Sequence, residues 1–366
     1  MKLKNFRKKA AVTTAAAICA AALSFPALPA PTAEASILGV LVSSGIQYAQ
    51  LDRAISYYNN DEQGRQKFFQ EIKDKYGTND DAALNSRLDT IMGNLSTAIA
   101  AVDPSINEKP YNYFINNETS FNAFCTLGHN MSVNTGLFNL IDSDDEIAVV
   151  LGHEMGHGQK DHPAKGIRKS IPIDVVAQIF ADAQGGYAGA MGATIFANYA
   201  TALQVTKPQE WEADNLAFDY ITHSTYNPGA CAAIWQSVME KQPSQSSSFV
   251  GEIFSPSDHP TNEQRRDNYA KKLHEFSQNK VSVDNGMVKV NGKDFLSPAP
   301  AAGMSTAERS YFVAGNLAAV YHTQAQTVPD AWVQDGTVLL GNQPIITPQN
   351  GDPSAQELAN RLNTIK

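Results

Sequence analysis

Five consecutive residues near the middle of this chain carry the clearest chemical signal: His153-Glu154-Met155-Gly156-His157. On a helix, residues four apart lie on one face, about 6 Å from each other, so both imidazoles can reach a single metal ion. The carboxylate next to the first histidine then lies beside that ion, where it can take a proton from a water molecule. The pattern therefore predicts a metal-dependent hydrolytic site.

The flanking residues predict the helix that this site needs. Ser143, followed three residues later by Glu146, is typical of a helix start at which the serine side chain caps the first turn. A largely apolar run at 147–151 follows, and His162-Pro163 is unfavourable for helix continuation. We expect a helix over about 144–160. Because glycine lowers helix propensity, we expect Gly152, Gly156 and Gly158 to give room for close packing or for substrate.

A catalytic zinc site needs three protein ligands and an open fourth position, so a third ligand must come from elsewhere in the chain. The best candidate is Glu210. Thr206 is a suitable helix cap, Pro208 suits a first turn, and Glu210 and Asp214 lie four residues apart. We expect Glu210 to bind the metal and Asp214 to accept a hydrogen bond from a ligand histidine.

Three ordered motifs carry a family resemblance. The pentad, the E-x-x-A-D pattern from Glu210 to Asp214, and His259-Pro260 with Arg265 six residues after that histidine together resemble the zinc metallopeptidases related to HtpX, BepA and the CAAX prenyl protease. The likeness extends over about residues 80–275. It implies an α+β, zincin-like (gluzincin) core that is mainly helical with a small sheet.

The resemblance also implies roles for individual residues. It assigns zinc binding to His153, His157 and Glu210, catalysis to Glu154, support of a ligand histidine to Asp214, a place near the metal to His259, and anchoring of that last segment to Arg265. His259 would stabilise the oxyanion or occupy the fourth coordination position at rest. Residues 130–133 look like the edge strand along which peptide substrates add. Lys207-Pro208 departs from the Ser-Arg usual before the glutamate ligand, so we expect different contacts at that helix start.

The first 35 residues predict an export signal. A basic start is followed by an alanine-rich apolar stretch at 10–25 and by Ala33-Glu34-Ala35, an A-x-A cleavage pattern. The apolar stretch is short for a membrane span. We therefore expect a periplasmic or secreted protein.

Charge and hydropathy argue against nucleic acid as a partner and against a membrane span. Without the signal, 23 basic and 36 acidic residues remain of the 28 and 37 in the full chain, a formal charge of −13, which argues against nucleic acid. Residues 183–204 contain no charged side chain, but their glycines and low hydrophobicity favour a buried helix pair or a lid over a membrane span. Whether Cys125 and Cys231 form a disulfide is left open by the sequence.

The mature chain divides into two parts. Residues 36–279 are predicted to form the metallopeptidase domain, which begins with helical segments near 44–58, 61–76 and 80–101. Residues 280–366 contain an internal repeat, because 286–298 can be laid on 336–348 with an offset of fifty and no gap. Each copy predicts a β-hairpin followed by a helix, so we expect a duplicated ββα appendage. Its role could be substrate recruitment, surface attachment or autoinhibition.

Together these patterns predict an exported zinc metalloendopeptidase with one Zn²⁺ per chain. We expect its substrates to be unfolded or misassembled proteins, and its process to be envelope protein quality control. The alternative is a periplasmic chaperone or binding protein with a weak or self-inhibited metal site. Retention of Glu154 argues against a purely structural zinc, which has no need of a general base.

Overall fold

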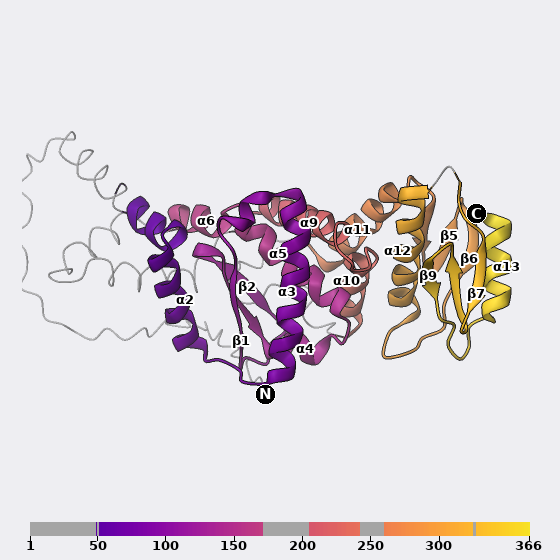
Figure 1. The fold of residues 1–366 in the computed structure, drawn as a ribbon, viewed down its shortest axis with the longest axis horizontal. Coiled ribbons are helices and arrows are strands. Elements are labelled where there is room, and N and C mark those ends of the chain that lie inside the picture. The colour runs from indigo at the N-terminus through magenta and orange to yellow at the C-terminus, as the bar shows by residue number, and fades with distance from the viewer. Residues whose placement is uncertain (1–48, 50, 171–204, 242–259, 325–326) are drawn as a thin grey trace, which may run out of the picture. The chain divides into compact units, whose positions relative to one another are not determined.

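The computed structural model describes residue 49 and residues 51–170, 205–241, 260–324 and 327–366 (Figure 1). Within these ranges the chain is mainly helical and has three small three-stranded sheets, in agreement with the α+β prediction. The predicted signal at 1–35, the stretch 183–204 and His259 lie outside the described residues. None of the described helices is long and apolar enough to cross a membrane.

The N-terminal helical segments form as predicted, where they are described. Residues 51–60 are helical, and α2 (Glu62–Tyr76) and α3 (Ala82–Val102) follow. Aspartates cap both later helices, because the Asp61 side chain accepts from Gly64 N and the Asp81 side chain from Ala83 N and Leu84 N. A 3₁₀ turn (Pro104–Asn107) then leads into the first sheet.

The first sheet has the order β1-β3-β2. Strand β3 (Asn130–Asn134) pairs in parallel with β1 (Asn112–Asn116) and antiparallel with β2 (Ala123–Thr126). The expectation that 130–133 form the edge strand is therefore wrong, because β3 is hydrogen bonded on both sides. Among the described strands, β2 pairs with β3 alone, so β2 is the edge strand that lies against the pentad helix.

The pentad helix, α5 (Asp144–Gln159), is the central element of this part and confirms the predicted span. The Ser143 side chain accepts from Glu146 N at 3.4 Å. Residues 146–158 are all buried, because α5 contacts α3, α9, α10 and β2. Short helices precede and follow it: α4 (Thr135–Leu140) and α6 (His162–Ser170).

Three further helices are described before residue 280: α9 (Lys207–Thr222), α10 (Ala230–Lys241) and α11 (Asn262–Phe276). Glycine allows α9 to approach α5 closely, as predicted. A Cβ atom on Gly156 would lie 3.2 Å from the backbone oxygen of Ala213 and 3.3 Å from its Cα. Cys125 and Cys231, on β2 and α10, are both buried and are not joined by a disulfide.

The C-terminal residues contain the predicted repeat, but with three strands in each copy instead of two. The first copy has β4 (Val281–Asp284), β5 (Met287–Val290), β6 (Lys293–Leu296) and α12 (Thr306–Gln324); the second has β7 (Ala331–Gln334), β8 (Thr337–Leu340), β9 (Gln343–Ile346) and α13 (Ala355–Ile365). Pairing registers coincide at the offset of fifty, since Val281 faces Val290 and Ala331 faces Leu340. Both central strands also carry an irregularity at the same place, after Val288 and after Val338.

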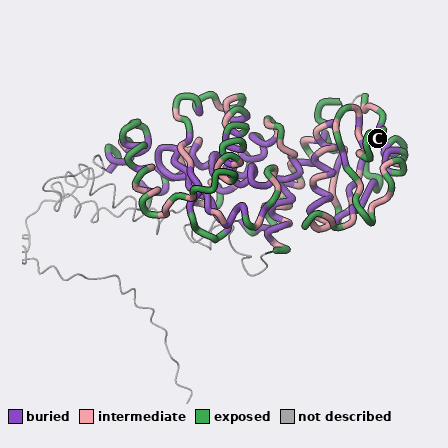
Figure 2. The backbone as a smooth tube through the Cα atoms, turned by 60° about the horizontal axis from the view of Figure 1, so that its bottom comes forward, coloured by how far each residue is buried: buried purple, intermediate pink, exposed green. Residues whose placement is uncertain are grey.

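Each repeat packs its helix partly on the other repeat. Helix α12 contacts β4 and β5 of its own copy and also β9, whereas α13 contacts β7 and β8 and also β6. Asn316 of α12 donates to the carbonyl of Ile345, and Arg361 of α13 donates to the equivalent carbonyl of Phe295. Figure 1 shows the strands between the two helices. The buried residues lie inside both parts of the chain (Figure 2).

The first repeat packs on α10 and α11, and Asn227 adds hydrogen bonds between α12 and the pentad helix. Asn227 N donates to the Asp145 side chain in the first turn of α5, at 2.9 Å. Its side-chain nitrogen donates to the carbonyl of Phe312 and to the Asn316 side chain, both on α12 at 3.0 Å. The start of the pentad helix and the first repeat therefore share a hydrogen-bonding partner.

A buried acid near this connection makes stability depend on pH. Glu146 of α5 and Glu308 of α12 are each 1% exposed, and burial, reinforced by the Glu308 carboxyl, raises the pKa of Glu146 from 4.5 to about 8. Lys241 opposes the shift and Asp145 adds to it. Between these pKa values the folded state binds more protons than the unfolded state, so the free energy of unfolding falls as the pH rises.

We expect Glu146→Gln to lose less stability than wild type between about pH 5 and about pH 8.5, because the amide does not ionise. Urea unfolding at several pH values measures this. Glu275→Gln, at an exposed position of α11, is the matched control and should keep the wild-type pH dependence. Identical pH dependence in wild type and Glu146→Gln would contradict the assignment.

Candidate metal centre

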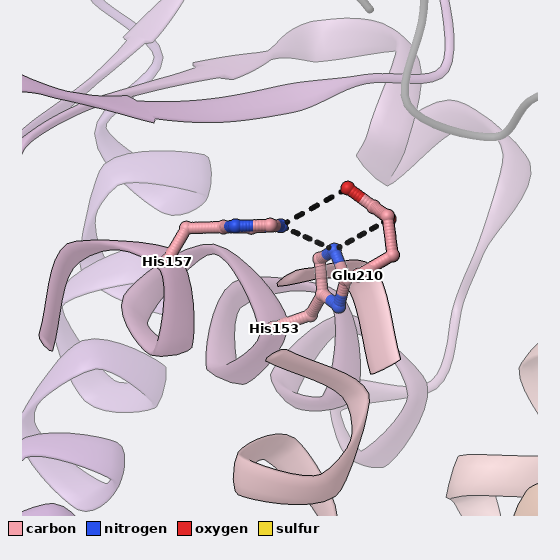
Figure 3. A group of neighbouring side chains, drawn as sticks. All are labelled: His153, His157 and Glu210. Carbon is pink, nitrogen blue, oxygen red and sulfur yellow. Dashed lines mark hydrogen bonds and ion pairs between the residues drawn. The ribbon is translucent and has the colours of Figure 1, made fainter. Parts of the chain in front are cut away.

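Helix α5 places both predicted histidine ligands on the face that meets α9. The Nε2 atoms of His153 and His157 lie 3.0 Å apart, with the rings edge to face. Figure 3 shows both rings turned toward the side chain of Glu210. The helical spacing of four residues thus brings the two nitrogens to one point, as the sequence predicted.

Helix α9 supplies the third member of the cluster. Glu210 Oε2 lies 3.6 Å from His153 Nε2, and Oε1 lies 3.4 Å from His157 Nε2. Gln209 stabilises the start of this helix, because its side-chain oxygen accepts from Thr206 N at 2.8 Å. The position of Glu210 therefore depends on the cap and on the close contact of α9 with α5.

The three side chains fit a small divalent ion. A tetrahedral ion with bonds of about 2.0–2.1 Å holds its ligand atoms about 3.3–3.4 Å apart. Here one atom from each residue lies within 4.8 Å of the others, and all three residues are buried. Two imidazoles and one carboxylate are also a donor set used in catalytic zinc sites. The cluster is thus placed to bind a metal.

Glu154 lies beside this cluster and is buried. Its Oε2 accepts from Cys125 N of β2 at 3.1 Å, and no described residue hydrogen bonds to its Oε1. Burial, with a contribution from Glu210, raises the pKa of Glu154 to about 7. Burial and the charge of Arg265 lower the pKa of His153 to about 4, so this imidazole is neutral, as a metal ligand must be.

Asp214 and Arg265 form a buried ion pair behind His153. Both Asp214 oxygens accept from the Arg265 guanidinium, and His153 Nδ1 lies 2.9 Å from Asp214 Oδ1. Burial alone would raise the pKa of Asp214, but Arg265 and the hydrogen bonds lower it. The aspartate therefore stays ionised and can hold the Nδ1 proton of His153, which directs Nε2 toward the metal position.

Two aromatic residues, which the sequence did not indicate, contact the ion pair of Asp214 and Arg265. The Arg265 guanidinium lies 3.9 Å from the ring centroid of Trp235, and the Tyr269 hydroxyl donates to Asp214 Oδ1 at 3.1 Å. Arg265 also lies 2.9 Å from His153 Nδ1. The predicted anchoring role of Arg265 thus corresponds to direct contacts with the residues around a ligand histidine.

Sequence reasoning also missed His162, which contacts His157, and Glu212, which contacts His162. The third histidine of the series 153, 157 and 162 was the available signal, but it was interpreted only as part of a helix end. His259 is the one predicted site residue that cannot be located, because it lies outside the described residues. All other predicted site residues gather around one point.

The comparison with known families decides the identity of this core. Residues 83–272, which include the whole described cluster, match the peptidase family M48. The chain belongs to this family. The predicted family resemblance and the assignment as a metalloendopeptidase are thereby confirmed.

Individual M48 relatives cover parts of the chain. Metalloprotease LoiP of Escherichia coli (strain K12) is 28% identical over 174 residues, 47% of this chain and 66% of LoiP. The beta-barrel assembly-enhancing protease of the same organism is 25% identical over 36% of this chain and 29% of its own length. Mitochondrial metalloendopeptidase OMA1 of Arabidopsis thaliana is 30% identical over 33% of this chain and 24% of OMA1. The matched part spans less than two thirds of each relative.

The ion pair behind His153 gives a stability prediction. We expect Arg265→Met to lower the free energy of unfolding by about 3–5 kcal/mol, because it leaves the Asp214 carboxylate buried without its cation. The adjacent Arg266→Met is the matched control. It removes ion pairs with the exposed Glu263 and Asp267 and should cost about 1 kcal/mol or less. Urea denaturation measures both, and equal losses would contradict the importance of the buried pair.

Proposed function

We propose that this M48 protein is an exported zinc endopeptidase that cleaves unfolded or misassembled proteins of the cell envelope. The observation that carries the proposal is the convergence of His153, His157 and Glu210 with Glu154 beside them. The predicted signal at 1–35 supports export. Similarity to a protease named for β-barrel assembly supports a role in envelope quality control.

The chain's own residues account for the proton transfers of peptide hydrolysis. When bound by His153, His157 and Glu210, zinc would polarise a water molecule and the scissile carbonyl. Glu154 takes a proton from the water while the water oxygen attacks the carbonyl carbon. It then gives that proton to the amine nitrogen as the C–N bond breaks. A pKa of about 7 suits both steps, because the carboxyl can gain and lose a proton near neutral pH.

Strand β2 is the best candidate for substrate pairing. The N–H of Cys125 is directed at Glu154, so this backbone group faces the catalytic carboxylate and not β3. An extended peptide added along this side of β2 would carry its main chain past Glu154. Main-chain pairing gives affinity with little dependence on side chains, which suits substrates of varied sequence.

Glu154→Gln tests the catalytic proposal. We expect the variant to cleave a fluorescently labelled unfolded protein about 10²–10⁴-fold more slowly than wild type, because general acid–base catalysis is lost. Zinc content, measured by mass spectrometry, should remain one ion per chain. A chelator should abolish wild-type cleavage, and added zinc should restore it. Glu275→Gln is the control for a glutamate substitution away from the site.

The outcomes separate the enzyme from the alternative function. Cleavage by Glu154→Gln at the wild-type rate would contradict the mechanism. A wild type that binds zinc and suppresses aggregation of an unfolded protein without cleaving it would favour the chaperone.

His259 is proposed as a second participant on the family resemblance alone. We expect His259→Ala to change the cleavage rate without changing the urea midpoint. A slower variant would indicate oxyanion stabilisation, and a faster one would indicate that His259 occupies the fourth coordination position at rest. An unchanged rate would contradict both roles.

A further inference from the structure

A turn after the pentad helix folds a third histidine back onto the metal cluster. His162 is five residues after His157, and on a continuous helix that spacing would place it about 140° around the axis. Helix α5 ends at Gln159, and Asp161 adopts a left-handed conformation with φ of 50°. The Asp161 side chain is held by Asn59 Nδ2 at 2.9 Å and by Lys109 Nζ at 3.3 Å. This turn begins α6 with His162, which is 1% exposed.

His162 contacts the side of His157 that points away from the metal position. The two Nδ1 atoms lie 2.8 Å apart. His162 Nε2 lies 3.1 Å from Glu212 Oε2 on α9. Side chains from three helices thus form one chain of contacts from α5 through α6 to α9.

The donors and acceptors of this chain are consistent with metal binding at His157. If Nε2 of His157 faces the metal, its Nδ1 carries the proton and donates to Nδ1 of His162. His162 must then carry its own proton on Nε2, which donates to the Glu212 carboxylate. Each nitrogen has one role, and only this pair of tautomers satisfies both contacts with neutral rings.

The other ligand histidine is supported in a different way. His153 is held by Asp214, a fully buried carboxylate whose charge is balanced by Arg265. Glu212 has a side chain that is 47% exposed and reaches its ligand histidine only through the His162 ring. Because Glu212 accepts the proton on Nε2 of His162, Nδ1 of His162 is left to accept from His157. A partly exposed carboxylate thus fixes the tautomer of a buried ligand through the His162 ring.

We propose that His162 and Glu212 are positioning residues that hold His157 in the tautomer and orientation required for metal binding. The inference rests on the proposed metal-dependent function and assigns two residues to it. Helix α9 then acts twice on the site, directly through Glu210 and indirectly through Glu212, two residues further along. The contacts of His162 with His157 and Glu212 also hold the turn at Asp161 between α5 and α9, the two helices that carry the ligands.

His162→Phe tests the proposal, since phenylalanine keeps a planar ring but cannot hydrogen bond. We expect the dissociation constant for zinc, measured by competition with a chromophoric chelator, to rise about 10–100-fold. Glu212→Ala should raise it by a smaller factor, and Glu212→Gln should stay near wild type because its amide oxygen still accepts from His162. Glu212→Ala added to His162→Phe should have no further effect, because both act through one chain of hydrogen bonds.

Controls separate positioning from a purely structural role. His223→Phe, at the exposed end of α9, and Glu275→Ala should leave zinc affinity unchanged. The absorption spectrum of the cobalt-substituted protein should change in His162→Phe and in Glu212→Ala but not in these controls.

Two negative results have different meanings. If His162→Phe and Glu212→Ala lower the urea midpoint of the metal-free protein but bind zinc as tightly as wild type, the inference is wrong while the metal site stands. If wild type binds no zinc, the proposed function itself fails.

Discussion

The close contact between α5 and α9 is the constraint on which the metal centre depends. His153 and His157 can meet Glu210 only if the two helix backbones approach to the distance set by Gly156 and Ala213. Helix α5 cannot shift away from α9, because α3, α10 and β2 pack on its other faces. The glycine lowers helix propensity at that position, and the resulting packing places a carboxylate between two imidazoles.

The charges around this contact explain why the cluster suits a cation. Three buried acids, Glu154, Glu210 and Asp214, lie around this contact. Arg265 is the cation that pairs with Asp214. Burial and the charge of Arg265 keep His153 neutral, whereas Glu210 and Glu154 outweigh the effect of burial on His157 and raise its pKa. Burial raises the pKa of Glu154 to about 7, and a divalent ion would stabilise the ionised form of these buried carboxylates. The electrostatic environment and the ligand spacing therefore favour the same occupant.

Sequence reasoning found those parts of the site that depend on local geometry. The helix from Ser143 and the ligands His153 and His157 follow from spacing along one helix, and Glu210 follows from a cap and an i, i+4 relation to Asp214. His162 could not be found in this way, because its position depends on the left-handed turn at Asp161, which is held by residues distant in sequence. Trp235 was missed for the same reason, since nothing near it indicates that it stacks on Arg265.

Pairing between strands was the least predictable feature of the fold. A strand-like segment does not identify its neighbours. The family resemblance implied an edge strand at 130–133, but β1 and β2 pair with its two sides. The hairpins predicted from 286–298 and 336–348 correspond to β5–β6 and β8–β9. The first strands, β4 and β7, were not predicted because they precede the repeated segments.

The helix of each C-terminal repeat packs on strands of both repeats, and the first of these helices, α12, also contacts the peptidase core. Because α12 packs on β9 as well as on β4 and β5, and α13 packs on β6 as well as on β7 and β8, each copy buries part of its apolar face against the other. Asn227 then contacts α12 and the first turn of α5 through one side chain and its own backbone. A close approach supports this bridge, since a Cβ atom on Gly315 would lie 1.9 Å from the Asn227 oxygen. Helix α12 packs on α10 and α11, and the hydrogen bonds of Asn227 add a link to the first turn of α5, the helix that carries His153 and His157.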